Sequence, residues 1–375
     1  MIYLDYSATT KPDKGVLDTF VEVSNRYFGN PNSLHKLGSE AKNLISASTS
    51  QIATILGVKE KEIIYTSGAT EANNTAIFGV IRSYTTRGKE IITTPLEHSS
   101  VLEPLKYLET LGYKIKYLSL DQNGLVDIED LKRKLSDETL LVSISSINSE
   151  TGIRQNVEQI GKVLKEYPKV IFHSDVTQSI GKEKINFDFI DLASFSAQKF
   201  YGLKGIGCLI KKEYISLIPL IHGGKSTTIY RSGTPAISLI ASLAKALRLA
   251  YTNIEENYAK VEKLNSFLIH ELKKIEDVHI NSNRYSIPNI VNISILGVKA
   301  ETMLHALEEE DIYLSTKTAC SGDGYSLAIY TLTGDKNLAS SSLRISLSHL
   351  TEKEELVVFM KILKEKVDHL KKIME

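Results

Sequence analysis

Short apolar runs of strand length alternate with segments of helical periodicity along most of the chain. The runs that predict strands are 62–66, 90–94, 114–118, 140–145, 170–175, 189–195 and 206–210. Between them, apolar spacing predicts helices, for example over 128–134 and, from Ile45, Ile52 and Ile55, a helix ending near Leu56. Alternating strand and helix units predict an α/β fold with a mainly parallel sheet and right-handed crossovers.

The pattern changes after the last of these strands. Helical periodicity dominates over 236–275, with an interruption near Asn253, and the remaining chain indicates a smaller α+β unit. Its expected elements are a strand at 290–295, a helix at about 301–309, a strand at 343–348 and a helix from about 352. We predict an N-terminal arm (1–14) that joins the small domain, a large domain (15–250) and a small C-terminal domain (251–375).

Composition narrows the functional classes. The 375 residues are 42% hydrophobic and 24% charged with zero formal net charge, which is typical of a soluble enzyme and gives no basic surface for nucleic acid. No apolar run approaches the roughly 20 residues that span a bilayer, and the first residues do not resemble a signal peptide. Only two cysteines, Cys208 and Cys320, argue against a disulfide framework and favour a reducing cytoplasm. No metal-ligand set is predicted.

Lys199 is the first candidate for chemistry. It follows the apolar strand 189–195 and precedes a glycine-rich turn, so we expect it at a strand end between buried segments. Desolvation lowers a lysine's preference for the charged form, and a neutral amine forms a Schiff base with a carbonyl. A solvated lysine beside a glycine turn is the common alternative.

Asp175 changes the balance between these alternatives. It ends the buried strand 170–175, where a carboxylate is what pyridoxal phosphate (PLP) requires to keep its pyridinium nitrogen protonated. A helix N-cap is the structural alternative for Asp175 alone. Asp175 and Lys199 together favour PLP.

Two further strand ends add candidates. The small residues of 67–74 join a strand to a helix, so the free N–H groups of the first helical turn predict an anion site that suits phosphate. His98 follows the strand 90–94, where it could stack on a cofactor ring and move protons, or simply cap the next helix.

Taken in order, these motifs resemble the cysteine desulfurases of the NifS/IscS kind, which are PLP enzymes of fold type I. The matching segments are 4–10 (LDYSATT), 29–31 (GNP), 66–74 (TSGATEANN), 97–98 (EH), 148–152 (NSETG), 175–178 (DVTQ), 196–199 (SAQK), 231–234 (RSGT), 319–321 (ACS) and 344–346 (RIS). The resemblance covers nearly the whole chain. It implies the aspartate-aminotransferase-like architecture, with a seven-stranded sheet in the large domain.

The resemblance also implies the role of each site residue. Lys199 would form the Schiff base with PLP and later shuttle protons, while Asp175 would pair with the pyridinium nitrogen. The other cofactor contacts would be His98 on the ring, Gln178 on the phenolic oxygen, and Ala69, Thr70, Ser196 and Gln198 at the phosphate. Asn148 and Arg344 would hold the substrate carboxylate. Thr234 would reach the phosphate of a neighbouring subunit, which implies a homodimer.

Cys320 decides the reaction. Among small polar residues, its thiolate would attack the sulfur of PLP-bound L-cysteine and leave L-alanine and a Cys320 persulfide. Cys208, inside an apolar run, is assigned to the core. The implied sulfur acceptor is an Fe–S scaffold or a tRNA- or cofactor-thiolating enzyme.

Three positions depart from the family pattern. Gln198 replaces the usual histidine, Lys225-Ser226 replaces Gln-Glu, and Ser315-Thr316-Lys317-Thr318 replaces a Ser/Gly-rich run. Three alternative functions stay open, of which the last is motivated by Gln198 and Lys225. They are a selenocysteine lyase, another PLP aminotransferase or lyase of the same fold, and a degenerate homologue that only binds a partner.

Overall fold

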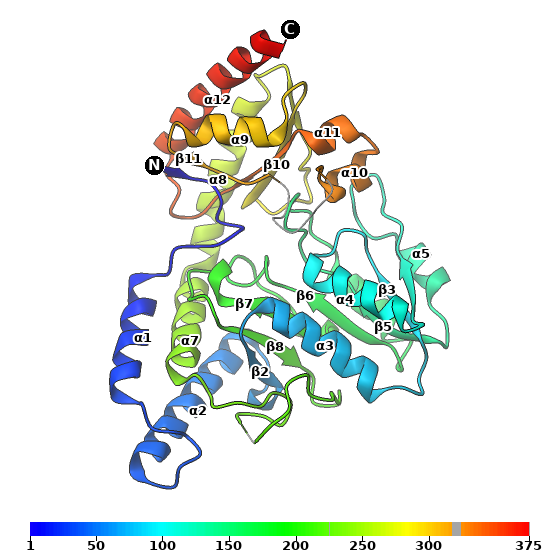
Figure 1. The fold of residues 1–375 in the computed structure, drawn as a ribbon, viewed down its shortest axis with the longest axis vertical. Helices are drawn as coiled ribbons and strands as arrows, with labels where there is room; N and C mark the ends of the chain where they lie inside the picture. The colour runs from blue at the N-terminus through cyan, green and yellow to red at the C-terminus, as the bar shows by residue number, and fades with distance from the viewer. Residues whose placement is uncertain (225, 317–323, 375) are drawn as a thin grey trace.

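The computed structural model describes residues 1–224, 226–316 and 324–374. Figure 1 shows two parts, a larger one built on a wide sheet and a smaller one that contains both ends of the described chain. Lys225, the segment 317–323 and Glu375 lie outside the described residues. The predicted role of Cys320 and the departure from the family pattern at Lys225 therefore concern residues that the structure does not describe.

A seven-stranded sheet in the order β2-β8-β7-β6-β5-β3-β4 forms the centre of the larger part. Its strands are β2 (Ile63–Thr66), β3 (Glu90–Thr93), β4 (Lys114–Tyr117), β5 (Thr139–Ser143), β6 (Ile171–Asp175), β7 (Leu192–Ser196) and β8 (Gly207–Lys211). All neighbouring pairs are parallel except the two that involve β8. The prediction of a mainly parallel sheet is confirmed.

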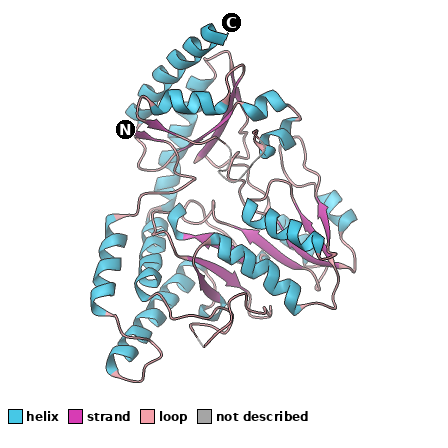
Figure 2. Ribbon diagram, viewed as in Figure 1, coloured by secondary structure: helices cyan, strands magenta, loops and turns pink. Residues whose placement is uncertain are grey.

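Helices cover both faces of this sheet (Figures 1 and 2). One face packs against α1 (Lys14–Arg26), α2 (Lys36–Leu56), α5 (Ile128–Lys134), α6 (Val157–Leu164) and α7 (Ile237–Thr252), and the other against α3 (Ala69–Ser83) and α4 (Ser99–Thr110). Neighbouring strand residues enter opposite cores, as Ile91 and Ile92 do. This double burial explains the consecutive apolar residues of central strands such as β5, in which every residue is buried.

The smaller part is α+β, as predicted. An antiparallel sheet in the order β12-β10-β9 packs against helices around a separate apolar cluster. The strands are β9 (Val278–Ile280), β10 (Ile290–Ile295) and β12 (Ser342–Ser346), and the helices are α8 (Ile254–Leu272), α9 (Ala300–Glu308), α10 (Leu327–Thr333), α11 (Lys336–Ser340) and α12 (Lys353–Met374). The break between α7 and α8 lies at Asn253, where helical periodicity is interrupted.

The N-terminal arm connects the two parts. Its strand β1 (Ile2–Tyr3) pairs in parallel with β11 (Ile312–Tyr313) of the smaller part. Further along the arm, the Thr10 amide donates to the carbonyl of Gln198 in the larger part, at 2.9 Å. The arm therefore passes close to Lys199. The division into arm, large and small domains at residues 14 and 250 stays a prediction.

Among the described helices, none is both long and apolar enough to cross a membrane.

Candidate active site

A cavity of about 390 Å³ lies at the carboxyl ends of the central strands. Segments that follow β2, β3, β5, β6 and β7 contribute to it, together with the N-terminal arm and Arg344 of β12. The predicted site residues that line it are Ala69, Thr70, His98, Asp175, Gln178, Ser196, Gln198, Lys199 and Arg344. Parallel strands place ligand sites at this edge, because their connections to helices open there.

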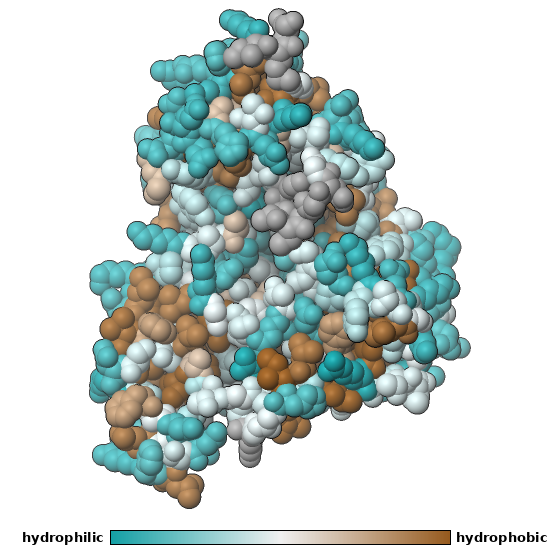
Figure 3. Space-filling view, viewed as in Figure 1, coloured by the Kyte–Doolittle hydropathy of each residue, from teal (hydrophilic) through white to brown (hydrophobic). Residues whose placement is uncertain are grey.

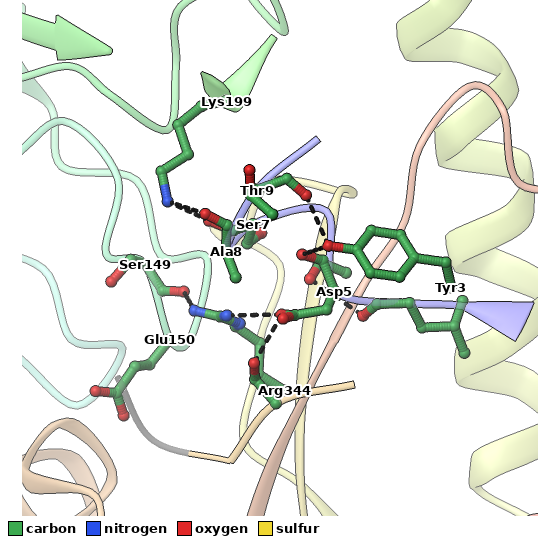
Figure 4. A network of polar contacts seen from close by, with 12 residues as sticks. Tyr3, Asp5, Ser7, Ala8, Thr9, Ser149, Glu150, Lys199 and Arg344 are labelled. Atoms are coloured by element: carbon green, nitrogen blue, oxygen red, sulfur yellow. Dashed lines mark hydrogen bonds and ion pairs between the residues drawn. The ribbon is translucent and has the colours of Figure 1, made fainter. Parts of the chain in front are cut away.

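Lys199 ends a short 3₁₀ turn, Ala197–Lys199, directly after β7. Its Nζ donates to the carbonyl oxygens of Ser7 at 2.8 Å and Ala8 at 2.6 Å, both in the N-terminal arm (Figure 4). Burial, with a further contribution from the Arg344 guanidinium, lowers the pKa of Lys199 to about 8. The amine is therefore neutral in a substantial fraction of molecules near neutral pH, as bonding to a carbonyl requires.

Asp175 is the last residue of β6, and only 8% of it is exposed. Its Oδ1 accepts from the Thr177 amide at 2.9 Å and its Oδ2 from Asn73 Nδ2 at 2.8 Å. The carboxylate closes its own turn and also lines the cavity. Hydrogen bonds to both oxygens therefore fix the orientation of the carboxylate inside the cavity. No described helix begins directly after Asp175, so the N-cap alternative is wrong, and the pairing of Asp175 with a pyridinium stays a prediction.

His98 caps the next helix, as one of its two alternatives predicts, and its stacking on a cofactor ring stays a prediction. It is the N-cap of α4, where Nδ1 accepts from the Ser100 amide at 3.1 Å, and its ring lines the cavity. Since Nδ1 accepts, the ring proton of the neutral imidazole lies on Nε2. Burial lowers the pKa of His98. The Asp175 carboxylate opposes this shift, and the positive charge of Lys199 lowers the pKa further.

The predicted anion site is the N-terminus of α3. Ala69 and Thr70 begin the helix, so their amides have no partner within it. Gly68 precedes them, and a Cβ on this residue would lie 3.4 Å from Ser196 Oγ. The missing side chain leaves a cradle between the helix N-terminus and a hydroxyl, which fits a phosphate group.

Arg344 reaches the cavity from the smaller part. Its Nη1 donates to the Ser149 carbonyl at 3.0 Å and its Nη2 to Asp5 Oδ1 at 2.9 Å (Figure 4). Its Nε is buried and has no partner among the described residues. The guanidinium is thus held in place with donors to spare, as a carboxylate-binding arginine needs.

Asn148 does not line this cavity. Its Oδ1 accepts from the amides of Glu150 and Thr151 at 3.0 and 2.8 Å, and its Nδ2 donates to the Leu96 carbonyl at 2.8 Å. The side chain holds the turn after β5, so its predicted contact with substrate stays a prediction. Thr234 lies in a separate hollow beside Arg231, outside the cofactor cavity of its own subunit.

Several site residues were not recognised from the sequence. Ser7 and Ala8 act through backbone carbonyls, which leave no side-chain signal. Asp5, Asn73 and Ser100 lie within or next to the quoted motifs, but only the fold shows their contacts with Arg344, Asp175 and His98.

The residues present fit PLP. The cavity brings together an amine of lowered pKa, a buried carboxylate fixed through both oxygens, and a helix N-terminus with room for phosphate. Among the described residues, no group of three or more His, Cys, Asp or Glu side chains is placed to hold a metal ion.

Comparison with known proteins agrees with this geometry. The aminotransferase class-V family matches residues 2–359, and the chain belongs to this family. It is a PLP-dependent enzyme of fold type I.

Within the family, the most informative relatives are desulfurases. A protein named cysteine desulfurase IscS from Dictyoglomus turgidum is 38% identical over 99% of this chain and 96% of that protein. A solved structure titled NifS-like protein superposes with a TM-score of 0.93 at 34% identity, covering 98% of this chain and 99% of that one. A structure titled SspA in complex with cysteine has a TM-score of 0.82 at 29% identity, covering 94% and 100%. The resemblance to the cysteine desulfurases is confirmed.

Proposed function

We propose that the protein is a PLP-dependent cysteine desulfurase that forms L-alanine and a persulfide on Cys320. The observation that supports this most is the convergence of Lys199, Asp175, His98 and Arg344 on one cavity. The relatives named cysteine desulfurase, and a structural neighbour whose title includes bound cysteine, support L-cysteine as the substrate.

We assign cofactor binding to residues of the cavity. The α3 N-terminus with Ala69, Thr70 and Ser196 holds the phosphate, with Gln198 beside it, and Asp175 pairs with the ring nitrogen. His98 covers the ring and Gln178 faces its phenolic oxygen. When bound, PLP supplies an electron sink for bonds at the substrate Cα.

The remaining residues act on the substrate. Arg344 binds its carboxylate in two-point fashion, with Asn148 predicted to assist. Lys199, once its amine is free, takes the Cα proton and returns protons to the carbon skeleton; the arm carbonyls of Ser7 and Ala8 accept from its ammonium form. His98, neutral and with its proton on Nε2, is suited to exchange a proton inside the cavity.

The sulfur step belongs to Cys320. Its thiolate attacks the substrate sulfur, an S–S bond forms and the substrate C–S bond breaks. The electron pair of that bond stays with carbon, which gains a proton, so that alanine leaves. Cys320 retains the second sulfur as a persulfide, and no external oxidant is needed.

We further propose a homodimer in which Thr234 reaches the partner's phosphate site. Arg231, just before it, donates to Glu71 Oε1 at 2.9 Å, and Glu71 lines the cavity. The loop that contains Thr234 is thus tied to the rim of its own site. The hydrophobic residues Leu17, Val21, Phe28 and Leu34 are exposed, and Figure 3 shows apolar surface gathered over α1, α2 and α7. A second copy would cover such a surface.

The acceptor of the persulfide sulfur is proposed to be an Fe–S scaffold or a tRNA- or cofactor-thiolating enzyme. A protein-bound persulfide is reduced by free thiols, so delivery to a docked acceptor is more efficient than release. The small number of cysteines fits a cytoplasmic setting.

The decisive assay measures alanine and sulfide formed from L-cysteine with a thiol reductant. Wild type, Cys320→Ala and Cys208→Ala are compared after loading with PLP. Cys208 is the matched control because it is the other cysteine and is fully buried in β8. Wild type and Cys208→Ala should make both products in equal amounts, and Cys320→Ala should make no sulfide.

Other outcomes would reject the proposal in identifiable ways. Full turnover by Cys320→Ala would indicate another PLP lyase or aminotransferase. Faster turnover of selenocysteine that does not depend on Cys320 would indicate a selenocysteine lyase. A protein that takes up no PLP would be a non-catalytic homologue.

A further inference from the structure

Asn73 lies on the fifth position of α3 and is completely buried. Its side-chain amide lies between two residues beside the cavity, Asp175 at the end of β6 and Ser100 in the first turn of α4. Asn73 Nδ2 donates to Asp175 Oδ2 and to Ser100 Oγ, each at 2.8 Å. One amide nitrogen therefore uses both of its N–H bonds inside the site.

The chemistry of the partners permits only this orientation of the amide. A carboxylate accepts hydrogen bonds and donates none, so a flipped amide would set an oxygen against Asp175 Oδ2. The Asn73 Oδ1 is buried without a partner among the described residues. An unpartnered buried oxygen is unfavourable, and a buried asparagine that tolerates it indicates that its two donors are what the site requires.

The direction of the hydrogen bond from Asn73 also determines how Ser100 can interact with His98. Because Ser100 Oγ accepts from Asn73, its own hydrogen is free to point at His98 Nδ1, which lies 2.8 Å away. The Ser100 amide also donates to Nδ1. Both donors oppose a proton on Nδ1, so the ring stays neutral and presents Nε2–H.

We propose that Asn73 is a positioning residue that fixes, through one amide, both the orientation of the Asp175 carboxylate and the protonation pattern of His98. This inference rests on the proposed function, because it assigns a supporting contact to two residues of that site. The hydrogen-bond chain runs from Asn73 to the Ser100 hydroxyl and on to His98, while the second N–H of Asn73 orients Asp175.

The charges around His98 do not favour a single form by themselves. Asp175 and Glu150 favour the imidazolium, whereas Lys199 and Arg344 oppose it, and burial also favours the neutral ring. The hydrogen bond from Asn73 to Ser100 Oγ turns the Ser100 hydroxyl toward His98 Nδ1, which favours the neutral ring. Its loss lets the Ser100 hydroxyl turn and accept from Nδ1–H, which makes the imidazolium more favourable.

Asn73→Leu tests both parts of the proposal, because leucine is close to asparagine in size and has no donors. Selective ¹⁵N labelling of the histidines reports the titration of His98 in the cofactor-free protein, with the signal assigned by its disappearance in His98→Gln. Ser100→Ala removes only the branch to His98. The matched control is Asn74→Leu, since Asn74 follows on the same helix and donates to the Thr70 carbonyl instead.

The expected result separates the two branches. The titration midpoint of His98 rises in Asn73→Leu and in Ser100→Ala, and combining the two changes adds little further. PLP affinity falls by about tenfold or more in Asn73→Leu, as for the loss of one hydrogen bond to a charged group. Ser100→Ala retains that affinity more closely, and Asn74→Leu matches wild type in both measurements.

Two results would overturn the inference. One is an unchanged His98 titration in folded Asn73→Leu and in Ser100→Ala. The other is wild-type PLP affinity in Asn73→Leu. If Asn73→Leu does not fold, the titration of Ser100→Ala still decides the His98 branch. The titration needs neither cofactor nor turnover, so it stays interpretable even if the desulfurase assay fails.

Discussion

The lowered pKa of Lys199 predicts how the protein captures its cofactor as pH changes. The amine must be neutral to attack the PLP aldehyde. Burial and Arg344 lower the pKa from 10.5 to about 8. At pH 7 about a tenth of the amines are then neutral, against about 0.03% at a pKa of 10.5, so uptake is roughly 300-fold faster than for an ordinary lysine.

Stopped-flow absorbance of cofactor-free protein mixed with PLP measures this directly. The uptake rate should rise with pH, bend near pH 8 and then level off. Nα-acetyl-lysine, measured in parallel, corrects for the titration of PLP itself. Arg344→Gln removes a positive charge beside Lys199, so the bend should move to higher pH.

Arg133→Gln is the control for a lost arginine, since Arg133 is an exposed side chain paired with Asp130 on α5. It should leave the bend in place. A corrected rate that keeps rising tenfold per pH unit up to pH 10 would refute the reasoning, because Lys199 would then titrate like a solvated lysine.

Three further predictions concern other residues. Arg344→Lys should raise KM for L-cysteine by about tenfold, equivalent to roughly 1.4 kcal/mol, because an ammonium cannot reproduce the two-point contact; an unchanged KM would contradict this. Cys208→Ala should lower the free energy of unfolding by about 1 kcal/mol in denaturant titrations while activity persists. Burial raises the pKa of Glu97 to about 8, despite the hydrogen bond that it accepts from the Ser145 amide. The folded state then holds a proton that the unfolded chain has lost, so Glu97 should make stability fall from pH 4.5 to 8, and Glu97→Gln should lack this fall.

Much of the fold could be predicted because its strands are buried on both faces. A short apolar run such as Val170-Ile171-Phe172 is a useful strand signal when polar residues, here ending with Asp175, follow it. The reversed direction of β8 depends on the short turn after Lys199, since so few residues cannot return the chain for a parallel strand. Asp175, His98 and Lys199 were found by the same rule, because each lies where a buried strand ends.

The rest depended on three-dimensional contacts. The Lys199 ammonium donates to the backbone carbonyls of Ser7 and Ala8. Every residue has such a carbonyl, so the sequence does not indicate which ones bind the lysine. Asn148 has the residue type of a substrate ligand, but only the fold shows that its Oδ1 accepts within its own turn and its Nδ2 donates to the Leu96 carbonyl. Asn73 lies inside a quoted motif, but its importance comes from the distance to Asp175, which no local pattern reveals.

The contacts of the N-terminal arm bear on how the protein folds during synthesis. Ile2 pairs with Ile312, and Asp5 with Arg344, so the arm can dock only after the chain has been synthesised past Arg344. Such long sequence separations close slowly and late in folding. The larger part can build its sheet during synthesis, but its lysine meets the arm only when the smaller part has docked. The site around Lys199 should therefore be completed only after the smaller part has docked, so its capacity to capture cofactor should report on the docking of two segments that lie far apart in the sequence.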